Sequence, residues 1–288
     1  MTAFDDRVAA LQAREGFAGM ISAAEAEAFA RDANVDVPRL MSMLLPFAAA
    51  YAKPPVSNFR VGCVSRGASG ALYYGTNVEF AGTDLTTTVH AEQSSVTNAW
   101  MSGETSIDFI AVTAPPCGYC RQFLNETAGA DRLQVAIDGA PRPLADYLPG
   151  AFGPRDLGLD SGLMAPLDHR FVIDSDDALA LEALRAANRS YAPYSKAYAG
   201  VALRAKDGAA FSGAYAENAA FNPSMSPLQV ALSRMNLAGR AFDAIADAVL
   251  VMAGAPIHLE ATRNVLAAVC TAPLRIVTAR NAGEAHSG

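Results

Sequence analysis

A repeat relates the two halves of the chain. Six residues recur at a constant offset of 138 positions without a gap, and two of them are glycines: Pro55, Ser57, Gly62, Gly75, Glu79 and Ala81 match Pro193, Ser195, Gly200, Gly213, Glu217 and Ala219. Repeated sequence at a fixed period indicates repeated structure. We therefore expect one fold to occur twice, which also suits a chain of 288 residues, longer than the usual domain of about 100–200 residues.

Composition limits the classes of partner. Hydrophobic residues make up 51% of the chain and charged residues 18%, so the chain can bury sizeable cores. A net charge of −7 argues against binding nucleic acid, which depends on clustered Lys and Arg. The longest apolar stretch, 43–52, is about ten residues, against roughly 20 needed to cross a bilayer. We expect a small-molecule partner, no nucleic-acid partner and no membrane segment.

The N-terminal sequence and the cysteines indicate a cytoplasmic protein. Asp5 and Asp6 stand where a secretory signal would carry basic and then apolar residues. Four cysteines in such a chain suit metal binding or catalysis better than a disulfide framework.

The pattern of apolar and turn residues predicts alternating strands and helices. Residues 1–44 are rich in alanine and predict helices, with Ser22 and Glu25 forming a capping box at one helix start. The segments that follow have the order ββαβαβ, which is typical of an α/β layered unit. Their expected ranges are 59–65 and 71–75 for a hairpin, 91–100 for a helix, 107–113 for a strand, a helix from about Pro116, and 133–137 for a strand.

Two short motifs contain the residues most suited to chemistry. His90-Ala91-Glu92 precedes Pro116-Cys117-Gly118-Tyr119-Cys120, and the first cysteine stands 27 positions after the histidine. Catalytic zinc takes three protein ligands and leaves one position for water, and one imidazole with two thiolates is a soft donor set that suits it. His90, Cys117 and Cys120 therefore predict a zinc site assembled at the N-termini of two helices, where free N–H groups favour thiolates.

Glu92 is the expected proton shuttle. It stands two residues from a predicted ligand, close enough to reach the activated water without binding the metal itself. Zinc lowers the pKa of a bound water to about 7, and one carboxyl group can then move the protons that hydrolysis of an amino-pyrimidine requires. The arrangement matches the H-x-E…P-C-x-x-C signature of zinc-dependent nucleobase deaminases.

Two other functions remain open at this point. A C-x-x-C pair alone is more typical of a structural zinc half-site or a redox pair, so a non-catalytic, zinc-stabilised interaction module is one alternative. A deaminase acting on another base, a nucleotide or a polynucleotide is the second. The added His-x-Glu and the single complete ligand set favour catalysis with one zinc per chain.

Nearly the whole chain resembles the cytidine deaminases, in particular the long bacterial type with a catalytic domain and a related domain that lacks a working site. The resemblance rests on residues 56–62, 77–80, 88–93, 116–123 and 147–154. It implies a duplicated three-layer α/β fold, with a mixed central sheet and helices on both faces. We expect a helical extension at 1–44, the catalytic domain at 45–154, a linker at 155–170 and the degenerate domain at 171–288.

The resemblance also implies an activity and a set of substrate contacts. The activity is zinc-dependent hydrolytic deamination of cytidine and 2′-deoxycytidine to uridine and 2′-deoxyuridine, with release of ammonia, in pyrimidine salvage by a homodimer. Asn77 and Glu79 would bind the ribose hydroxyls, and Phe59 would stack on the base. The Ala91 carbonyl would accept a hydrogen bond from the 4-amino group, and Phe152 would close the pocket of its own or a neighbouring subunit.

The second half of the chain departs from this pattern. With a loop shorter by two residues, the counterpart of His90-Ala91-Glu92 is Ser226-Pro227-Leu228, and no C-x-x-C follows. Tyr215 stands at the position of Asn77. These side chains cannot bind zinc or move a proton as the first set can, so we expect a metal-free, structural half.

Overall fold

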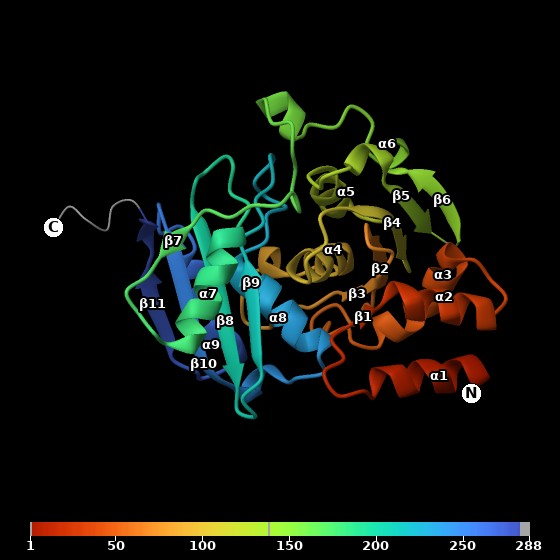
Figure 1. Cartoon of the computed structure of the whole chain (residues 1–288), viewed down its shortest axis with the longest axis horizontal. Coiled ribbons are helices and arrows are strands. Elements are labelled where there is room, and N and C mark those ends of the chain that lie inside the picture. Colours follow the sequence, from red (N-terminus) through yellow and green to blue (C-terminus); the bar gives the residue numbers. More distant parts are fainter. Residues whose placement is uncertain (1, 138, 283–288) are drawn as a thin grey trace.

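The computed structural model describes residues 2–137 and 139–282, so the last positions of the predicted second domain, 283–288, lie outside the described residues. Two α/β modules lie side by side, the N-terminal one on the right of Figure 1 and the C-terminal one on the left. We call them the first and second modules, and the segment 148–170 connects them. No helix in the described part of the chain is long and apolar enough to cross a membrane.

Three helices precede the first sheet, and their bounds are α1 Ala3–Gln12, α2 Ala23–Asp32 and α3 Val37–Ala49. The predicted capping box is confirmed, because the Glu25 N–H donates to Ser22 Oγ and the Ser22 N–H donates to the Glu25 carboxylate. Helix α3 runs across residue 44, where the sequence predicted the extension to end, and it packs on the first sheet.

The sheet of the first module is mixed and has the order β1-β3-β2-β4-β5-β6. Strands β4 and β5 are parallel, and the other neighbours are antiparallel. The bounds are β1 Met20–Ile21, β2 Gly62–Gly67, β3 Leu72–Thr76, β4 Ile107–Val112, β5 Gln134–Ile137 and β6 Ala140–Pro143. Helix α3 covers one face, and α4 Ala91–Met101 covers the other together with α5 Gly118–Asn125; α6 is Leu144–Tyr147.

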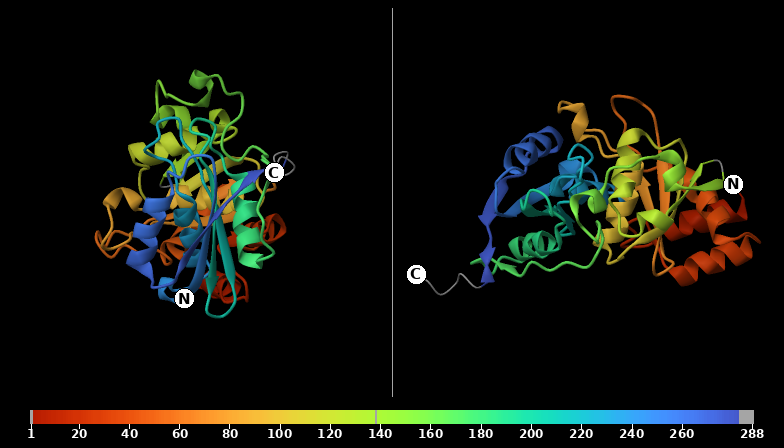
Figure 2. Two further views of the ribbon diagram at one scale, coloured as in Figure 1. Left: turned by 90° about the vertical axis from the view of Figure 1, so that its left-hand side faces the viewer. Right: turned by 90° about the horizontal axis from the view of Figure 1, so that it is seen from above.

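The second module repeats this arrangement with fewer strands. Its sheet has the order β11-β10-β8-β9, with α7 on one face and α8 and α9 on the other (Figures 1 and 2). The bounds are α7 Ala178–Arg189, β8 Tyr198–Ala205, β9 Ala210–Ala214, α8 Pro227–Leu237, β10 Ile245–Ala253, α9 Leu259–Val269 and β11 Leu274–Thr278. A separate pair joins β7 Phe171–Val172 to β12 Arg280–Asn281. The predicted duplicated three-layer fold is confirmed.

The repeated glycines allow helices to lie directly on strands. A Cβ atom added to Gly75 on β3 would lie 2.2 Å from the carbonyl oxygen of Ala91, in the first turn of α4. At Gly213 on β9 it would lie 2.3 Å from the carbonyl oxygen of Pro227, in the first turn of α8. Real Cβ atoms cannot approach backbone this closely, so only glycine fits. The other repeated pair meets α3 and α7 in the same way: Gly62 and Gly200.

Helices α4 and α8 bring the two modules together. They pack against one another in the middle of the molecule, and one hydrophobic core extends from the first sheet across both helices to the second sheet (Figure 1). Gln93 on α4 donates to the carbonyl of Pro223 at 2.8 Å, and Gln229 on α8 donates to the carbonyl of Thr87 at 2.7 Å. These reciprocal bonds relate the modules by an approximate two-fold axis.

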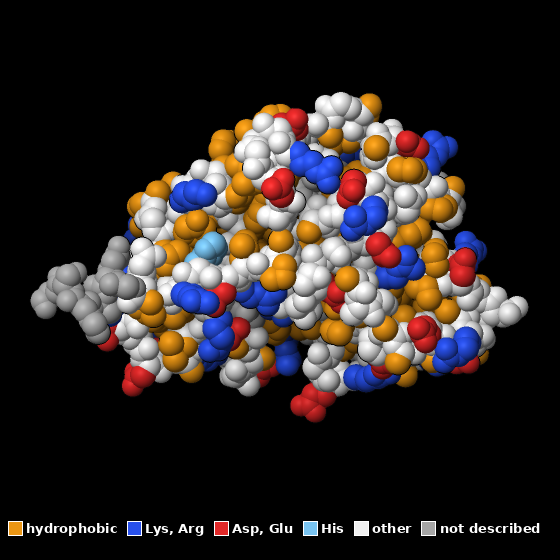
Figure 3. Space-filling model, turned by 45° about the horizontal axis from the view of Figure 1, so that its top comes forward, with side chains coloured by type: hydrophobic (Ala, Val, Ile, Leu, Met, Phe, Trp, Pro, Cys, Tyr) orange, Lys and Arg blue, Asp and Glu red, His pale blue; other side chains and the backbone are white. Residues whose placement is uncertain are grey.

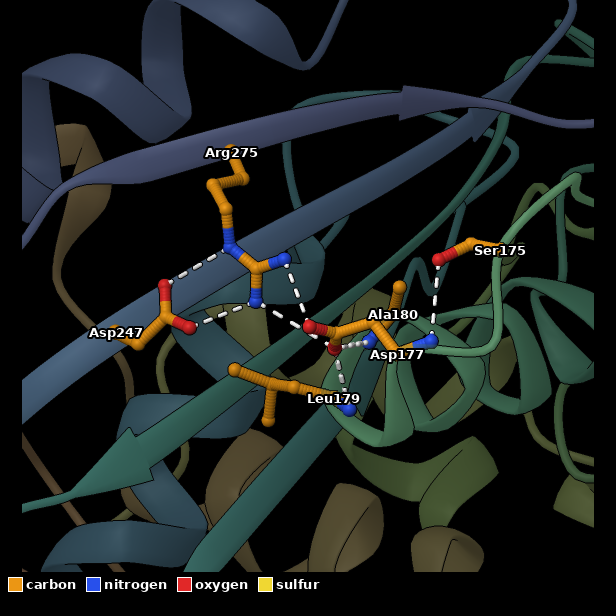
Figure 4. A network of polar contacts seen from close by, with 6 residues as sticks. All are labelled: Ser175, Asp177, Leu179, Ala180, Asp247 and Arg275. Atoms are coloured by element: carbon orange, nitrogen blue, oxygen red, sulfur yellow. Dashed lines mark hydrogen bonds and ion pairs between the residues drawn. The ribbon is translucent and has the colours of Figure 1, made fainter.

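An ionic cluster links the edge strand of the second module to the rest of that module. Arg275 on the edge strand β11 lies between Asp247 on β10 and Asp177, the N-cap of α7 (Figure 4). Asp177 also accepts from the backbone N–H groups of Leu179 and Ala180. These two hydrogen bonds, together with the ion pair to Arg275, lower the pKa of the Asp177 carboxyl. The guanidinium therefore ties the edge strand to a helix that covers the sheet.

Most predicted elements occur close to their expected ends. The helix expected at 91–100 occurs at 91–101, and the strand expected at 107–113 occurs at 107–112. The hairpin starts later than expected, at Gly62, because the Asn77 side chain takes up the Val61 N–H and the Phe59 carbonyl in place of a neighbouring strand. Strand β6 was not expected; it contains Pro141 and Pro143, which an edge strand tolerates.

We predict that Gly75→Ala and Gly213→Ala each lower the free energy of unfolding by about 1–3 kcal/mol, because the added methyl group forces α4 or α8 away from its strand. Denaturant unfolding of the purified variants measures this. Gly118→Ala is the matched control, since its Cβ would meet nothing within 4 Å. Equal stability of Gly213→Ala and Gly118→Ala would contradict the prediction.

Candidate metal centre and active site

Three predicted ligands meet at the starts of two helices. His90 is the N-cap of α4, and Cys117 is the N-cap of α5. His90 Nδ1 lies 3.5 Å from Cys117 Sγ and 3.3 Å from Cys120 Sγ, and the two sulfurs are 3.6 Å apart. This is the one group of three possible metal ligands found among the described residues.

The spacing of these atoms fits zinc. Two sulfurs bound at about 2.3 Å to a tetrahedral zinc ion lie about 3.8 Å apart, and a sulfur and an imidazole nitrogen about 3.6 Å apart. The observed separations are close to both values, whereas a disulfide would bring the sulfurs to about 2.05 Å. Cys117 is exposed, His90 is half-buried and Cys120 is buried, so the group is open to solvent on one side, as a catalytic metal site requires.

Glu92 lies beside the ligand group and does not belong to it. Its Oε2 is 3.2 Å from Cys120 Sγ, and its side chain is buried. Burial raises the pKa of the Glu92 carboxyl above its usual value. A buried carboxyl group with a raised pKa holds a proton more readily than a free one, which suits a group that must accept a proton and pass it on.

The two cysteines differ in acidity. Their mutual hydrogen bond, assisted by His90, lowers the pKa of the Cys117 thiol to about 3, while the same contact and burial raise the pKa of Cys120 well above its usual value. Without metal, the contact therefore favours the thiolate at Cys117 and the protonated thiol at Cys120.

Helix α4 is buried along its length although many of its side chains are polar. Every residue from 91 to 100 is buried. The polar groups have partners inside the protein: Ser95 Oγ donates to the Tyr73 carbonyl at 2.9 Å, and Asn98 Nδ2 to the Tyr74 carbonyl at 3.3 Å. Because buried polar groups are costly without such partners, these bonds hold α4 in a single position, and His90 with it.

Asn77 and Glu79 face the same loop, 54–61. Glu79 accepts from the Val56 and Ser57 N–H groups at 2.8 and 3.0 Å, and also from the Ser57 hydroxyl. Asn77 accepts from Val61 and donates to the Phe59 carbonyl. The two side chains therefore hold the loop that presents Phe59, whose side chain is 60% exposed. A carboxylate has about four lone-pair sites, so Glu79 keeps acceptor capacity for a ligand.

Ala91 presents a different atom from the one expected. Its carbonyl oxygen lies against Gly75 on β3 in the packed interior. Ala91 is the first residue of α4, where a backbone N–H has no acceptor within the helix. The N–H of Ala91 is thus the group better placed for a ligand than its carbonyl.

Phe152 lies in the connecting segment, beside the C-terminal half of α5. Its carbonyl accepts from Gln122 Nε2 at 2.7 Å and Asn125 Nδ2 at 3.1 Å, and its ring is 47% exposed. A cavity of about 500 Å³ lies between this loop and the end of α5, and its lining does not include the ligand group.

Sequence reasoning missed the contacts that the second module makes around the ligands. The Tyr119 ring stacks on His90, with ring centres 5.8 Å apart, and the Tyr119 hydroxyl donates to the carbonyl of Asn222. Nothing local in the sequence could reveal this pair, because the partners are separated by 103 positions.

The second module places Ser226 where the first has His90. Ser226 is the N-cap of α8, and Gln229 accepts from its N–H as Gln93 accepts from that of His90. Tyr215, at the position of Asn77, donates its hydroxyl to Glu217 and packs on His258. Aromatic rings thus fill the part of the second module that corresponds to the Asn77 side chain.

We predict that in metal-free protein Cys117 reacts with iodoacetamide at a rate that changes little between about pH 5 and 7, because its thiolate is already formed, whereas an ordinary thiol of pKa about 8.5 speeds up roughly tenfold per pH unit. Peptide mass spectrometry of samples quenched at intervals gives the rate at each cysteine. Cys270 is the internal control, since burial raises the pKa of its thiol. A Cys117 rate that follows pH as an ordinary thiol does would contradict the prediction.

Comparison with known proteins places the chain in a family. The model of the cytidine and deoxycytidylate deaminase zinc-binding region matches residues 36–137, and a second model of that description matches residues 144–263. The chain is 46% identical to the cytidine deaminase of Vibrio parahaemolyticus over 270 residues, covering 93% of this chain and 92% of that protein. It is 50% identical to the enzyme of Vibrio vulnificus over 234 residues, covering 80% and 79%.

Among solved structures, the cytidine deaminase of Mycobacterium tuberculosis is 32% identical, with a TM-score of 0.37, and the match covers 40% of this chain and 96% of that one. The chain is 46% and 50% identical to the two Vibrio proteins over most of its length, and two family models match it. The chain therefore belongs to the cytidine deaminase family.

Proposed function

We propose that the protein hydrolyses cytidine and 2′-deoxycytidine to uridine and 2′-deoxyuridine with release of ammonia. The observation that carries the proposal is the cluster of His90, Cys117 and Cys120 with the buried carboxyl of Glu92 beside it. The relatives named as cytidine deaminases support the choice of substrate. One zinc ion per chain is part of the proposal.

The chain's own residues perform defined tasks in this reaction. His90, Cys117 and Cys120 hold zinc, which when bound supplies the Lewis acidity that makes water nucleophilic at neutral pH. Glu92 accepts the proton that water loses on attacking C4 of the base and delivers a proton to ring N3. Glu92 then carries a further proton to the departing amino group, so that cytidine and water become uridine and ammonia.

Other side chains select and orient the nucleoside. The exposed ring of Phe59 would stack on the base, and Asn77 and Glu79 would bind the ribose hydroxyls with the acceptor and donor capacity left after holding the loop. Ala91 would contribute its first-turn N–H to an oxygen of the base. Phe152 would close the pocket of its own or a neighbouring subunit.

The organisation of the protein follows from the same proposal. We infer a homodimer, supported by large apolar side chains that remain exposed in the connecting segment, Phe152 and Leu157 at 47% each. We retain 45–154 as the catalytic domain, with α3 shared between it and the extension, 155–170 as the linker, and the second domain as metal-free. A role in pyrimidine salvage in the cytoplasm completes the proposal.

A nucleotide or polynucleotide substrate is the nearest alternative. On the face drawn in Figure 3, Lys and Arg side chains alternate with Asp and Glu and form no basic stripe, which favours an uncharged nucleoside. A panel of cytidine, deoxycytidine, deoxycytidylate and short DNA, followed by the change in ultraviolet absorbance, separates these substrates. Preference for a phosphate-bearing substrate would replace the proposal.

We predict that Glu92→Ala keeps the fold and one zinc per chain but lowers kcat for cytidine by a factor of about 10² to 10⁴ or more, because proton transfer is lost. Zinc is measured by elemental analysis and turnover by ultraviolet absorbance. Cys117→Ala is the companion variant, and it should lose metal and activity together. Undiminished turnover by Glu92→Ala, or a zinc-loaded wild-type protein that leaves cytidine unchanged, would refute the proposed function.

We predict that free cytosine is a poor substrate of the wild-type protein. Glu79→Gln should lower kcat/KM for cytidine at least about tenfold and leave the low kcat/KM for cytosine nearly unchanged, because Glu79 binds the sugar. Ser57→Ala is the control, since it removes one loop contact of Glu79 and keeps the carboxylate. If Glu79→Gln reduced both substrates equally, Glu79 would act only by holding the loop.

A further inference from the structure

A buried carboxylate joins the end of α5 to the second module. Glu126 is the C-cap of α5, and its side chain is fully buried. Its Oε1 accepts from the hydroxyls of Tyr191 at 2.8 Å and Tyr194 at 2.6 Å, and its Oε2 accepts from the Ala219 N–H at 2.8 Å. All three donors belong to the second module. We call Glu126, Tyr191, Tyr194 and Ala219 the Glu126 cluster.

No cation in the described part of the chain pairs with Glu126. Among the residues that the structure describes, it forms no ion pair of 4 Å or less. Burial raises the pKa of this carboxyl, and three hydrogen bonds oppose the shift. A well-packed apolar side chain would stabilise such an interface at lower cost than a buried charge. Hydrogen bonds are directional and apolar contacts are not, so the cluster fixes how the end of α5 is oriented against the second module.

Two further contacts bind the same side of α5 to the second module. The Tyr119 hydroxyl donates to the Asn222 carbonyl. The Gln122 side chain donates from Nε2 to Asn218 Oδ1 at 3.4 Å, and Asn218 Nδ2 donates to the Gln122 carbonyl at 3.0 Å. These contacts and the Glu126 cluster follow one another along α5, at positions 119, 122 and 126, a spacing that places them near one face of a helix. Cys120 directly follows Tyr119 in the chain, and Cys117 is at the opposite end of α5 from Glu126.

We propose that the Glu126 cluster is the device by which the second module positions the metal ligands. Glu126 is a positioning residue that acts through α5: it fixes the rotation and axial place of the helix, and with them the distances of Cys117 and Cys120 from His90. The inference rests on the proposed function only in requiring a metal at the three ligands.

The geometry makes such control effective. Helix α5 has eight residues and is about 12 Å long at 1.5 Å per residue, so a movement at its C-terminal end reaches its N-cap with little loss. The place of His90 is set on α4, which is held on β3 by contacts of its own, at Gly75, Ser95 and Asn98. Displacement of α5 alone therefore opens the ligand group.

The experiment compares Glu126→Gln and Tyr194→Phe with Glu104→Gln in the full-length zinc-loaded protein. Glu104 is the matched control, a buried carboxylate that accepts hydrogen bonds from Tyr73 and Ser69 within the first module. Three quantities are measured for each: the rate of zinc loss to excess chelator, the absorption spectrum of the cobalt-substituted protein, and the free energy of unfolding. Tyr194→Phe removes a single hydroxyl and keeps the test available if Glu126→Gln does not fold.

We expect Glu126→Gln and Tyr194→Phe to lose zinc about tenfold faster or more, the size of effect seen when groups that orient metal ligands are removed, and to alter the sulfur-to-cobalt absorption. Glu104→Gln should lower stability without changing either metal readout. The inference is overturned if Glu126→Gln and Tyr194→Phe release zinc at the wild-type rate with an unchanged cobalt spectrum, or if Glu104→Gln accelerates release equally. Because no readout uses cytidine, failure to deaminate cytidine would count against the proposed function alone.

Discussion

The structure depends on the burial of α4 between a sheet and a second helix. On one side its first turn touches β3 at Gly75, where any side chain would collide, and on the other side it packs against α8. Its small polar side chains bond to the backbone of β3 and to the second module, with Ser94 Oγ lying 2.7 Å from Ser233 Oγ. A helix held from all sides gives its N-cap residue, His90, a fixed place to which the α5 cysteines can be matched.

This arrangement explains why a half without ligands is retained. The second module supplies α8 as the counterpart of α4, and its loop 217–226 contacts both helices whose N-termini carry the ligands. His90, Ala91 and Glu92 of the first module correspond to Ser226, Pro227 and Leu228 in the second, yet the close contact at Gly213 and the cap formed by Gln229 remain. The second module therefore keeps the helix-on-strand packing of the first module and lacks its metal ligands and its proton-transferring carboxyl group.

The sequence was sufficient for the parts of the site that are local. His90 and Cys117 could be placed at helix starts because capping residues and proline mark such positions within a few residues. The repeated glycines predicted the duplication for the reason that the structure displays, close contact of helix and strand. The start of β2 was predicted three residues early, because the competing partner, the Asn77 side chain, is distant in sequence.

Features that need two distant segments could not be predicted. Strand β6 is a fully exposed edge with two prolines, so it lacks the alternation that marks a strand. The role of Glu126 depends on donors 65 to 93 positions away. The Ala91 carbonyl was expected to face a ligand, and only the depth of the Gly75 contact shows that it faces β3.

The hydrophobic core that continues through α4 and α8 has a thermodynamic consequence. Its members come from both sheets, so unfolding either half would expose apolar surface of the other and leave the α4 hydroxyls and amides without their acceptors. Neither half can melt while the other stays folded without meeting this penalty. The two modules therefore unfold together as a single cooperative unit, although the sequence shows two repeats.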